Sequence, residues 1–289
     1  MKALSCYRWA VAGLAAFGSI AVAQEKLPRT DLQEPVFRLS KSDPGAEAAP
    51  AHPLDPALQI AYEGLKQVRE RIDDYSGVMV KRERVNGTLT EQEFMSFKIR
   101  NRRVQDGKIT TPFSIYLKFL KPQAVAGREV IYVEGQNNNY LVAHETGWKG
   151  LVRANLDPNG WLAMSGNRYP ITDAGIENLV VKLIEKGERD RNRDECEVKF
   201  FKNAKINDRV CTVLQVTHPV ERPYFDFHIA QIFIDDEYRV PIRYASYSWP
   251  KEQGGKAQLE EEYTYTDLKF NVGLTEADFN PDNEAYDYP

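Results

Sequence analysis

The sequence has few of the residues that commonly mark a catalytic or cofactor site. It contains three cysteines and four histidines among 289 residues. No Gly-x-Ser-x-Gly segment is present to hold a nucleophilic serine, and the nearest partial match, Ser165-Gly166, lacks the preceding glycine. So few cysteines cannot form a disulfide framework. The composition therefore disfavours serine hydrolases and disulfide-rich scaffolds, and we expect no cofactor and no bound metal.

The sequence also lacks an excess of positive charge, with 38 Lys and Arg against 42 Asp and Glu, and has few long apolar runs. The formal net charge is -4, which argues against nucleic acid as a partner because a phosphate backbone requires a basic protein surface. Beyond residue 22, no segment approaches the roughly 20 apolar residues of a membrane-spanning helix. We therefore expect the folded part of the chain to be soluble.

The one apolar run, residues 9–22, is typical of a secretory signal peptide. Lys2 and Arg8 precede it, and Ala21-Val22-Ala23 supplies the small residues that a signal peptidase needs. Cleavage is expected after this segment. Loss of the two basic residues takes the formal charge from -4 to -6. Residues 1–23 are thus predicted to direct export to the periplasm or the extracellular medium.

A leader and a helix are expected next. Residues 24–54 are rich in Pro, Ala, Ser and charge, which predicts a disordered segment before a single domain over 55–289. Asp55 is suited to cap a helix and Pro56 to occupy its first turn. Apolar residues then recur at spacings of three and four, which predicts a helix of about five turns. They are Leu58, Ala61, Tyr62, Leu65, Val68 and Ile72.

A second helix is predicted after residue 171. Thr172 or Asp173 is expected to cap it. One apolar stripe follows at helical spacing. Its members are Ile176, Leu179, Val180, Leu183 and Ile184.

The rest of the domain is predicted to form strands. Asn86-Gly87 suits the positive φ angles of a tight hairpin between residues 75–85 and 91–102. In residues 113–119 apolar and polar side chains alternate, which predicts one buried face. Other strands are expected at 128–134, 140–145, 195–201, 210–217, 225–234, 240–249 and 259–270. Short connections make the sheet antiparallel, so the fold class is α+β: a large curved antiparallel sheet, or half-open barrel, covered by two main helices.

Four segments resemble a known family. They are Lys81-Arg82-Glu83-Arg84, Gly127-Arg128-Glu129-Val130 with Asn137-Asn138-Asn139, Arg168-Tyr169-Pro170-Ile171-Thr172, and Tyr263-Thr264-Tyr265-Thr266-Asp267-Leu268 through Asp278-Phe279. Over about residues 58–288 the chain resembles domain of unknown function family 1571. Its element order is more distantly similar to the periplasmic lipoprotein carriers and to a sigma-factor regulator's sensor domain. That resemblance implies a half-open barrel with a helical lid that holds acyl chains.

The leading hypothesis is a non-enzymatic binding protein of the cell envelope. It would hold a lipid, an acyl chain or a lipidated protein segment between the sheet and its helical lid. Many aromatic residues fall on predicted strands, and a filled core and a ligand cavity both stay open as explanations. The long loop over 153–170 is either a lid or plain packing. The residues expected to contact the ligand are Phe97, Phe113, Phe119, Trp161, Met164, Leu179, Leu183 and Phe227.

Two other functions stay open. If a turn lies near Arg222-Pro223, His218 would face Asp226, and His228 would share the face of Asp226, as in a zinc site or an acid–base hydrolase. Alternatively, an envelope sensor or scaffold would bind another protein through a sheet edge or the 153–170 loop. Basic residues within 81–84 and 98–103 either contact lipid headgroups at a membrane surface or pair with neighbouring glutamates.

Cys196 and Cys211 pose a question of strand register. A disulfide closing their loop of about fifteen residues would contribute roughly 3 kcal/mol. A hairpin centred near Asn203-Ala204 brings the two cysteines opposite each other. A turn at Asn207-Asp208 instead pairs Cys211 with Ala204 and leaves both thiols free. An oxidising compartment favours the first arrangement and the turn residues favour the second.

Overall fold

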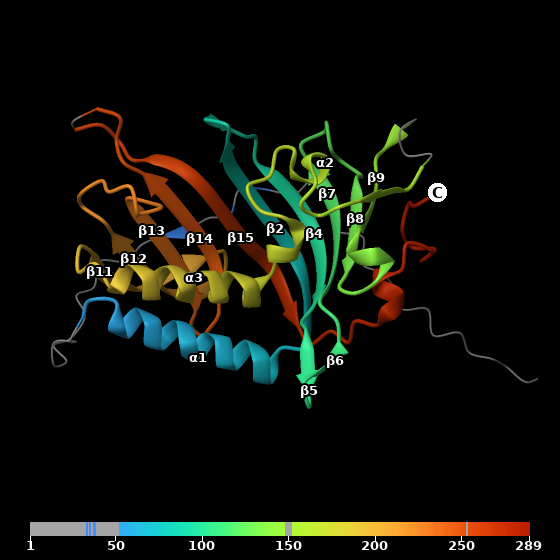
Figure 1. The fold of residues 1–289 in the computed structure, drawn as a ribbon, viewed down its shortest axis with the longest axis horizontal. Helices are drawn as coiled ribbons and strands as arrows, with labels where there is room; N and C mark the ends of the chain where they lie inside the picture. Colours follow the sequence, from blue (N-terminus) through green and yellow to red (C-terminus); the bar gives the residue numbers. More distant parts are fainter. Residues whose placement is uncertain (1–32, 34, 36, 39–51, 148–151, 253) are drawn as a thin grey trace, which may run out of the picture. The chain divides into compact units, whose positions relative to one another are not determined.

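One antiparallel sheet holds most of the chain together (Figure 1). The structure is a computed structural model that describes residues 33, 35, 37–38, 52–147, 152–252 and 254–289. The signal peptide and nearly all of the leader expected from the sequence lie outside these residues. Within the described ranges, no helix is long and apolar enough to cross a membrane.

The main sheet has 13 described strands in the order β1-β11-β12-β13-β14-β15-β2-β4-β7-β8-β9-β10, with β3 beside β2, and its two ends do not pair with each other. A separate hairpin, β5-β6, stands apart from it. The strands are β1 (Phe37–Arg38), β2 (Asp74–Val85), β3 (Thr88–Leu89), β4 (Glu93–Arg100), β5 (Arg103–Gln105), β6 (Lys108–Thr111), β7 (Ser114–Lys121), β8 (Glu129–Val133), β9 (Leu141–His144), β10 (Ala154–Leu156), β11 (Glu197–Ile206), β12 (Arg209–Thr217), β13 (Ile229–Asp235), β14 (Pro241–Ser248) and β15 (Gln258–Phe270).

The predicted α+β class and the antiparallel sheet are confirmed, since each of the strand pairings between described residues is antiparallel. The helices are α1 (Asp55–Arg71), α2 (Trp161–Met164) and α3 (Ile176–Arg191), with 3-10 turns η1 (Asn137–Asn139), η3 (Ile171–Asp173) and η4 (Glu276–Phe279). The Asn86-Gly87 hairpin forms as expected, with φ angles of 51° and 80°.

Helices α1 and α3 lie side by side across one face of the sheet, which we call the helix face (Figure 1). Alternate residues of each strand point to this face. On β2 it carries Tyr75 and Met79, whose cross-strand partners on β4 are Ile99 and Met95. All four are buried in one apolar cluster with residues of α1 and α3. This cluster is the larger part of the core.

Both helix starts differ from the prediction. Asp55 is the first residue of α1 rather than its cap, and its carboxylate accepts a hydrogen bond from the backbone N–H of His52 at 3.0 Å. Thr172 and Asp173 form η3, and the residue before α3 is Gly175, at φ 102°. The Tyr75 hydroxyl accepts the Ile176 N–H at 2.7 Å. A strand side chain thus takes the place of a local cap.

The prediction of a single buried face for residues 113–119 is wrong. Tyr116 points away from the helix face and is nevertheless buried. Tyr286, from the C-terminal segment, stacks on its ring at 4.1 Å between centroids. The backbone N–H of Asp287 donates to the buried Glu129 carboxylate at 2.9 Å. The C-terminal segment therefore covers the outer face of β7 and β8.

The register of strands β11 and β12 keeps the two cysteines apart, so they cannot form a disulfide. The turn between β11 and β12 lies at Asn207-Asp208, Cys211 pairs with Ala204, and both thiols are free. Burial raises the pKa of the Cys196 thiol to about 11 and that of Cys211 to about 12. Both thiols are therefore protonated and poorly reactive in the folded protein.

Alkylation tests this register. Unfolding the purified protein in guanidinium without a reductant, in the presence of iodoacetamide, should label both Cys196 and Cys211, as read by peptide mass spectrometry. The folded protein at neutral pH should label slowly at both positions. A prereduced sample is the control, and labelling that appears only after reduction would show that a disulfide exists.

Candidate functional site

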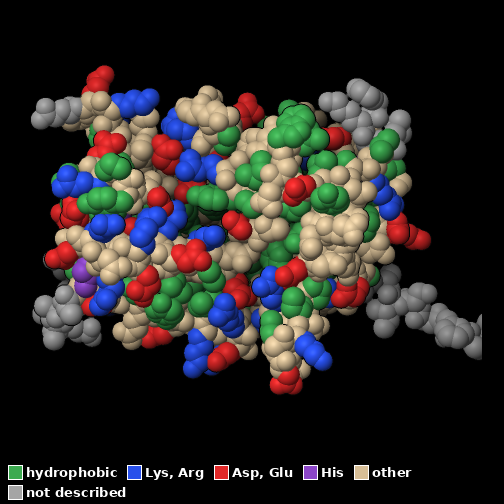
Figure 2. Space-filling view, in the orientation of Figure 1, with side chains coloured by type: hydrophobic (Ala, Val, Ile, Leu, Met, Phe, Trp, Pro, Cys, Tyr) green, Lys and Arg blue, Asp and Glu red, His purple; other side chains and the backbone are tan. Residues whose placement is uncertain are grey.

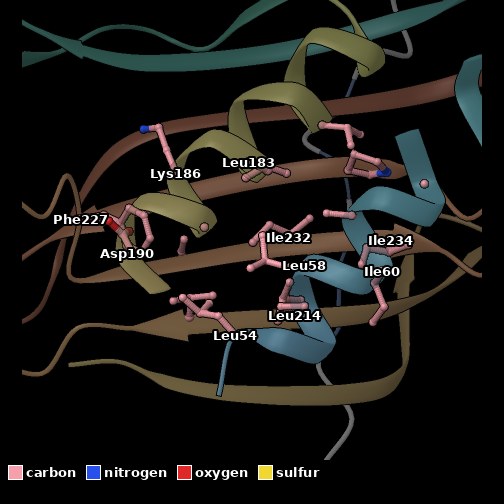
Figure 3. A pocket seen from close by; sticks show the side chains of 18 of the residues that line it. Leu54, Leu58, Ile60, Leu183, Lys186, Asp190, Leu214, Phe227, Ile232 and Ile234 are labelled. Atoms are coloured by element: carbon pink, nitrogen blue, oxygen red, sulfur yellow. The ribbon is translucent and has the colours of Figure 1, made fainter. Parts of the chain in front are cut away.

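An apolar pocket lies between the two long helices and strands β12 to β14 (Figure 3). Its volume is about 70 Å³, on a measure in which one water needs on the order of 10–15 Å³. It is lined by Leu54, Ala57, Leu58, Ile60, Ala61, Gly64, Val180, Leu183, Lys186, Gly187, Asp190, Leu214, Val216, Phe227, Ala230, Ile232, Ile234, Arg239 and Pro241. Nearly all of these side chains are apolar.

Sequence periodicity explains the pocket walls. On the strands, Leu214 of β12 faces Ile232 of β13, and both point to the helix face. The helices approach closely at small residues. A Cβ at Gly187 of α3 would lie 2.9 Å from Cδ2 of Leu58, so the two helices meet here with no room for a side chain. The pocket is the space that remains beneath this contact.

One end of the pocket is polar. Asp190, in the last turn of α3, lies beside Phe227, whereas Ile60 and Ile234 lie at the opposite end (Figure 3). Asp190 is 3% exposed and its carboxylate accepts a hydrogen bond from Arg189 Nε at 2.9 Å. Lys186 also borders the pocket. The site therefore combines an apolar chamber with a charged end.

The residues predicted to contact a ligand are dispersed. Leu183 and Phe227 line the pocket, and Leu179 packs in the same apolar cluster beside it. The other five lie elsewhere: Phe97, Phe113 and Phe119 are buried in the larger cluster, and Trp161 and Met164 belong to α2. Trp161 is 79% exposed. The 153–170 segment is not a plain loop, because it contains β10 and α2.

The sequence does not identify Asp190, or the residues of α1 that line the pocket, as part of a site. The sequence predicts the helix over 55–71 as one of the two that cover the sheet, but it names none of the residues of this helix as ligand contacts. Asp190 carries a recognisable signal. It continues the α3 stripe of Ile176, Val180, Leu183 and Gly187 at the same spacing of three and four. A carboxylate at such a position must be buried against the sheet.

The predicted His218, Asp226 and His228 cluster does not form. The backbone N–H of His218 donates to the His228 carbonyl at 2.8 Å, so these two residues face each other. Asp226 turns to α3, where it pairs with Lys186 at 3.0 Å and Arg189 at 3.2 Å. The register therefore differs from the expected one, in which His218 would face Asp226. Among the described residues, no group of three His, Cys, Asp or Glu side chains is arranged to hold a metal ion.

A second, polar cluster lies on the helix face near the far end of β2. Glu83 and Glu261 are cross-strand partners, both 2% exposed. The Tyr263 hydroxyl donates to Glu83, and burial together with the nearby glutamates raises the pKa of Tyr263, which keeps it protonated. Lys81 Nζ lies 3.4 Å from Glu83 Oε2, and Arg168 Nε lies 3.5 Å from Glu261 Oε2. The cluster fastens the segment before α3 to the sheet.

The basic residues within 81–84 and 98–103 are largely paired with acids. Lys81 also binds Glu93 at 3.0 Å, and Arg100 binds Glu276 at 2.7 Å. On the face seen in Figure 2, Lys and Arg side chains are interspersed with Asp and Glu. This mixture agrees with the interpretation that the basic residues within 81–84 and 98–103 pair with neighbouring glutamates.

The burial of His218 predicts a pH dependence of stability. Burial lowers the pKa of this imidazole from 6.5, an effect that Asp190 and Asp226 oppose and Arg189 reinforces. Below about pH 6.5 the unfolded chain binds a proton that the folded protein resists, so folding stability falls as pH falls. Urea unfolding at pH 7 and pH 5 should show this loss, and His218→Gln should reduce it.

His228→Gln is the matched control for that experiment, because it changes a neighbouring, partly exposed histidine. It should retain the parent's pH dependence. Equal dependence in the parent and His218→Gln would show that His218 is not the titrating group.

Comparison with known proteins yields a family and several structural neighbours. A family model described as "Protein of unknown function (DUF1571)" matches residues 72–288. No curated protein matches the sequence.

Three solved structures illustrate the neighbours. A DUF1329 family protein from Desulfovibrio piger is 14% identical over 80% of this chain and 98% of its own, with a TM-score of 0.36. A putative outer membrane lipoprotein-sorting protein domain from Vibrio parahaemolyticus is 15% identical over 77% and 95%, with a TM-score of 0.37. The MucA/MucB complex structure from Pseudomonas aeruginosa matches at 17% identity over 78% and 60%, with a TM-score of 0.41.

Proposed function

This chain belongs to the DUF1571 family of proteins of unknown function, and we propose that it is an exported, non-enzymatic binding protein of the cell envelope. Its ligand is an apolar chain, as in a lipid or a lipidated protein segment. The observation that carries the proposal is the apolar pocket between α1, α3 and the sheet. The expected signal peptide supports export.

The pocket is too small for a long acyl chain, so binding requires the protein to open. About 70 Å³ holds on the order of five waters, which is less than a long acyl chain needs. A chain therefore enters only when α1 and α3 separate from the strands. Burying each methylene contributes about 0.8 kcal/mol. A chain of about ten methylenes thus supplies a gross gain of about 8 kcal/mol to offset the cost of that opening.

Mass spectrometry of organic extracts tests the proposal directly. Protein purified from the exported fraction should carry a stoichiometric lipid. After delipidation, acyl-chain ligands should raise the melting temperature because a ligand that binds only the folded state stabilises it by mass action. An empty protein that no acyl-chain ligand stabilises would contradict the proposal.

Substitution of Leu183 tests whether α3 is a lid over a ligand cavity or an ordinary core helix. A fully packed leucine costs about 2–5 kcal/mol when cut to alanine, but Leu183 is only partly buried and borders the pocket. We expect Leu183→Ala to lower the melting temperature of the lipid-free protein modestly and to abolish most of the ligand-induced shift.

Leu179→Ala is the matched control. Leu179 lies one turn earlier on α3, is also partly buried, and does not line the pocket. This variant should lose stability while keeping the ligand-induced shift. A large loss of stability in Leu183→Ala, with no ligand-induced shift in the parent protein, would identify α3 as an ordinary core helix.

A further inference from the structure

The polar end of the pocket contains a buried carboxylate. Asp190 is the one acid among the described residues that line the pocket. It lies in the last turn of α3, where the backbone carbonyls already carry partial negative charge. A carboxylate at this position is costly unless hydrogen-bond donors surround it. Its Oδ1 accepts from Arg189 Nε, and its Oδ2 lies near His218.

The group of His218 that lies near Oδ2 is another acceptor. His218 is fully buried, and its ring stacks on Phe225 at 3.7 Å between centroids. Its Nδ1 lies 3.0 Å from the Phe227 carbonyl oxygen. Because a carbonyl only accepts, Nδ1 carries the proton, and in a neutral imidazole Nε2 is then an unprotonated acceptor. Burial, which lowers the pKa of His218, favours this neutral form.

The two acceptors lie close together at the Asp190 end, although His218 itself is not among the residues that line the pocket. His218 Nε2 lies 3.6 Å from Asp190 Oδ2, which is longer than a hydrogen bond. Nε2 has no hydrogen-bond partner within the part of the chain that the structure describes. A group that satisfies both atoms must donate hydrogen bonds.

The cations near this end are already engaged. Lys186 binds Asp226, and Arg189 binds both Asp190 and Asp226. Within the described part of the chain, an incoming carboxylate would therefore meet Asp190 beside cations that already have acidic partners. The other cation in the lining is Arg239, which follows β13 next to Gly64 of α1.

We propose that Asp190, with the unprotonated His218 Nε2 beside it, forms a polar anchor that selects ligands whose apolar chain ends in an uncharged hydrogen-bond donor, such as a hydroxyl or an amide N–H, over chains that end in a carboxylate. This inference rests on the proposed function and defines the ligand class of the same pocket. The headgroup lies at the Asp190 end, and the chain runs between α1, α3 and strands β12 to β14.

Two ligands with the same twelve-carbon chain test the anchor. Delipidated protein is loaded with the fluorescent probe N-phenyl-1-naphthylamine, which is then displaced by 1-monolauroylglycerol or by laurate, each below its micelle concentration. Monolauroylglycerol should bind about tenfold more tightly, the ratio expected for one hydrogen bond to a charged group. Asp190→Asn should bring that ratio close to one.

Glu188→Gln is the matched control. It removes the same charge from the same turn of α3, but Glu188 is exposed and does not line the pocket, so the tenfold preference should remain. His218→Asn is a second variant in case Asp190→Asn does not fold. Its amide keeps a donor for the Phe227 carbonyl and removes the Nε2 acceptor, so it should also weaken the preference. Circular dichroism and melting temperature establish that each variant is folded.

The outcomes separate this inference from the function on which it rests. If neither ligand displaces the probe, the binding function itself fails. Equal affinities, or tighter binding of laurate, overturn the anchor while the binding function stands. A preference that survives in folded Asp190→Asn and in His218→Asn also overturns it.

Discussion

The structure depends on covering a very wide sheet with two short helices. The path of twelve strands is about 53 Å wide at about 4.8 Å per step, whereas α1, with 17 residues, is about 25 Å long. Because the helices run across the strands (Figure 1), they cover only about half of the helix face. Other segments of the chain must cover the remaining strands. The contacts that attach each of these segments determine how firmly it is held to the sheet.

Buried charged side chains hold these other covering segments to the sheet. Glu83 and Glu261 lie opposite each other on the helix face, a costly arrangement that Lys81 and Arg168 offset. They hold the segment before α3. On the outer face Glu129 plays a similar part for the C-terminal segment. Except for Glu261, these groups belong to the segments by which the sequence resembles its family. Over β12 to β14 the contacts of the pocket are almost wholly apolar, and the charged contact at its edge is that of Asp226 with Lys186 and Arg189.

Local sequence patterns predict the helices and strands well, but they do not identify contacts between residues that are far apart in the chain. Alternation and the Asn86-Gly87 turn identify strands because those signals lie within a few residues. The cap of α3 was missed because it is Tyr75, about a hundred residues away. The burial of Tyr116 depends on Tyr286 in the same way. The anchor at Asp190 needs the register of the loop before His228, which two prolines make unreadable from sequence.

Polar contacts tie the two helices to each other and, at both ends, to the sheet or its loops, so the pocket lies where packing alone holds them. Along their exposed edges Arg69 binds Glu177 at one end and Arg191 binds Asp55 at the other. At the first end, α1 runs directly into β2, and Tyr75 of β2 holds the start of α3. At the opposite end Lys186 and Arg189 of α3 bind Asp226, which lies between β12 and β13. Both ends of the helix pair are therefore fastened by polar contacts, and packing alone holds the apolar stretch between them over β12 to β14, where the pocket lies.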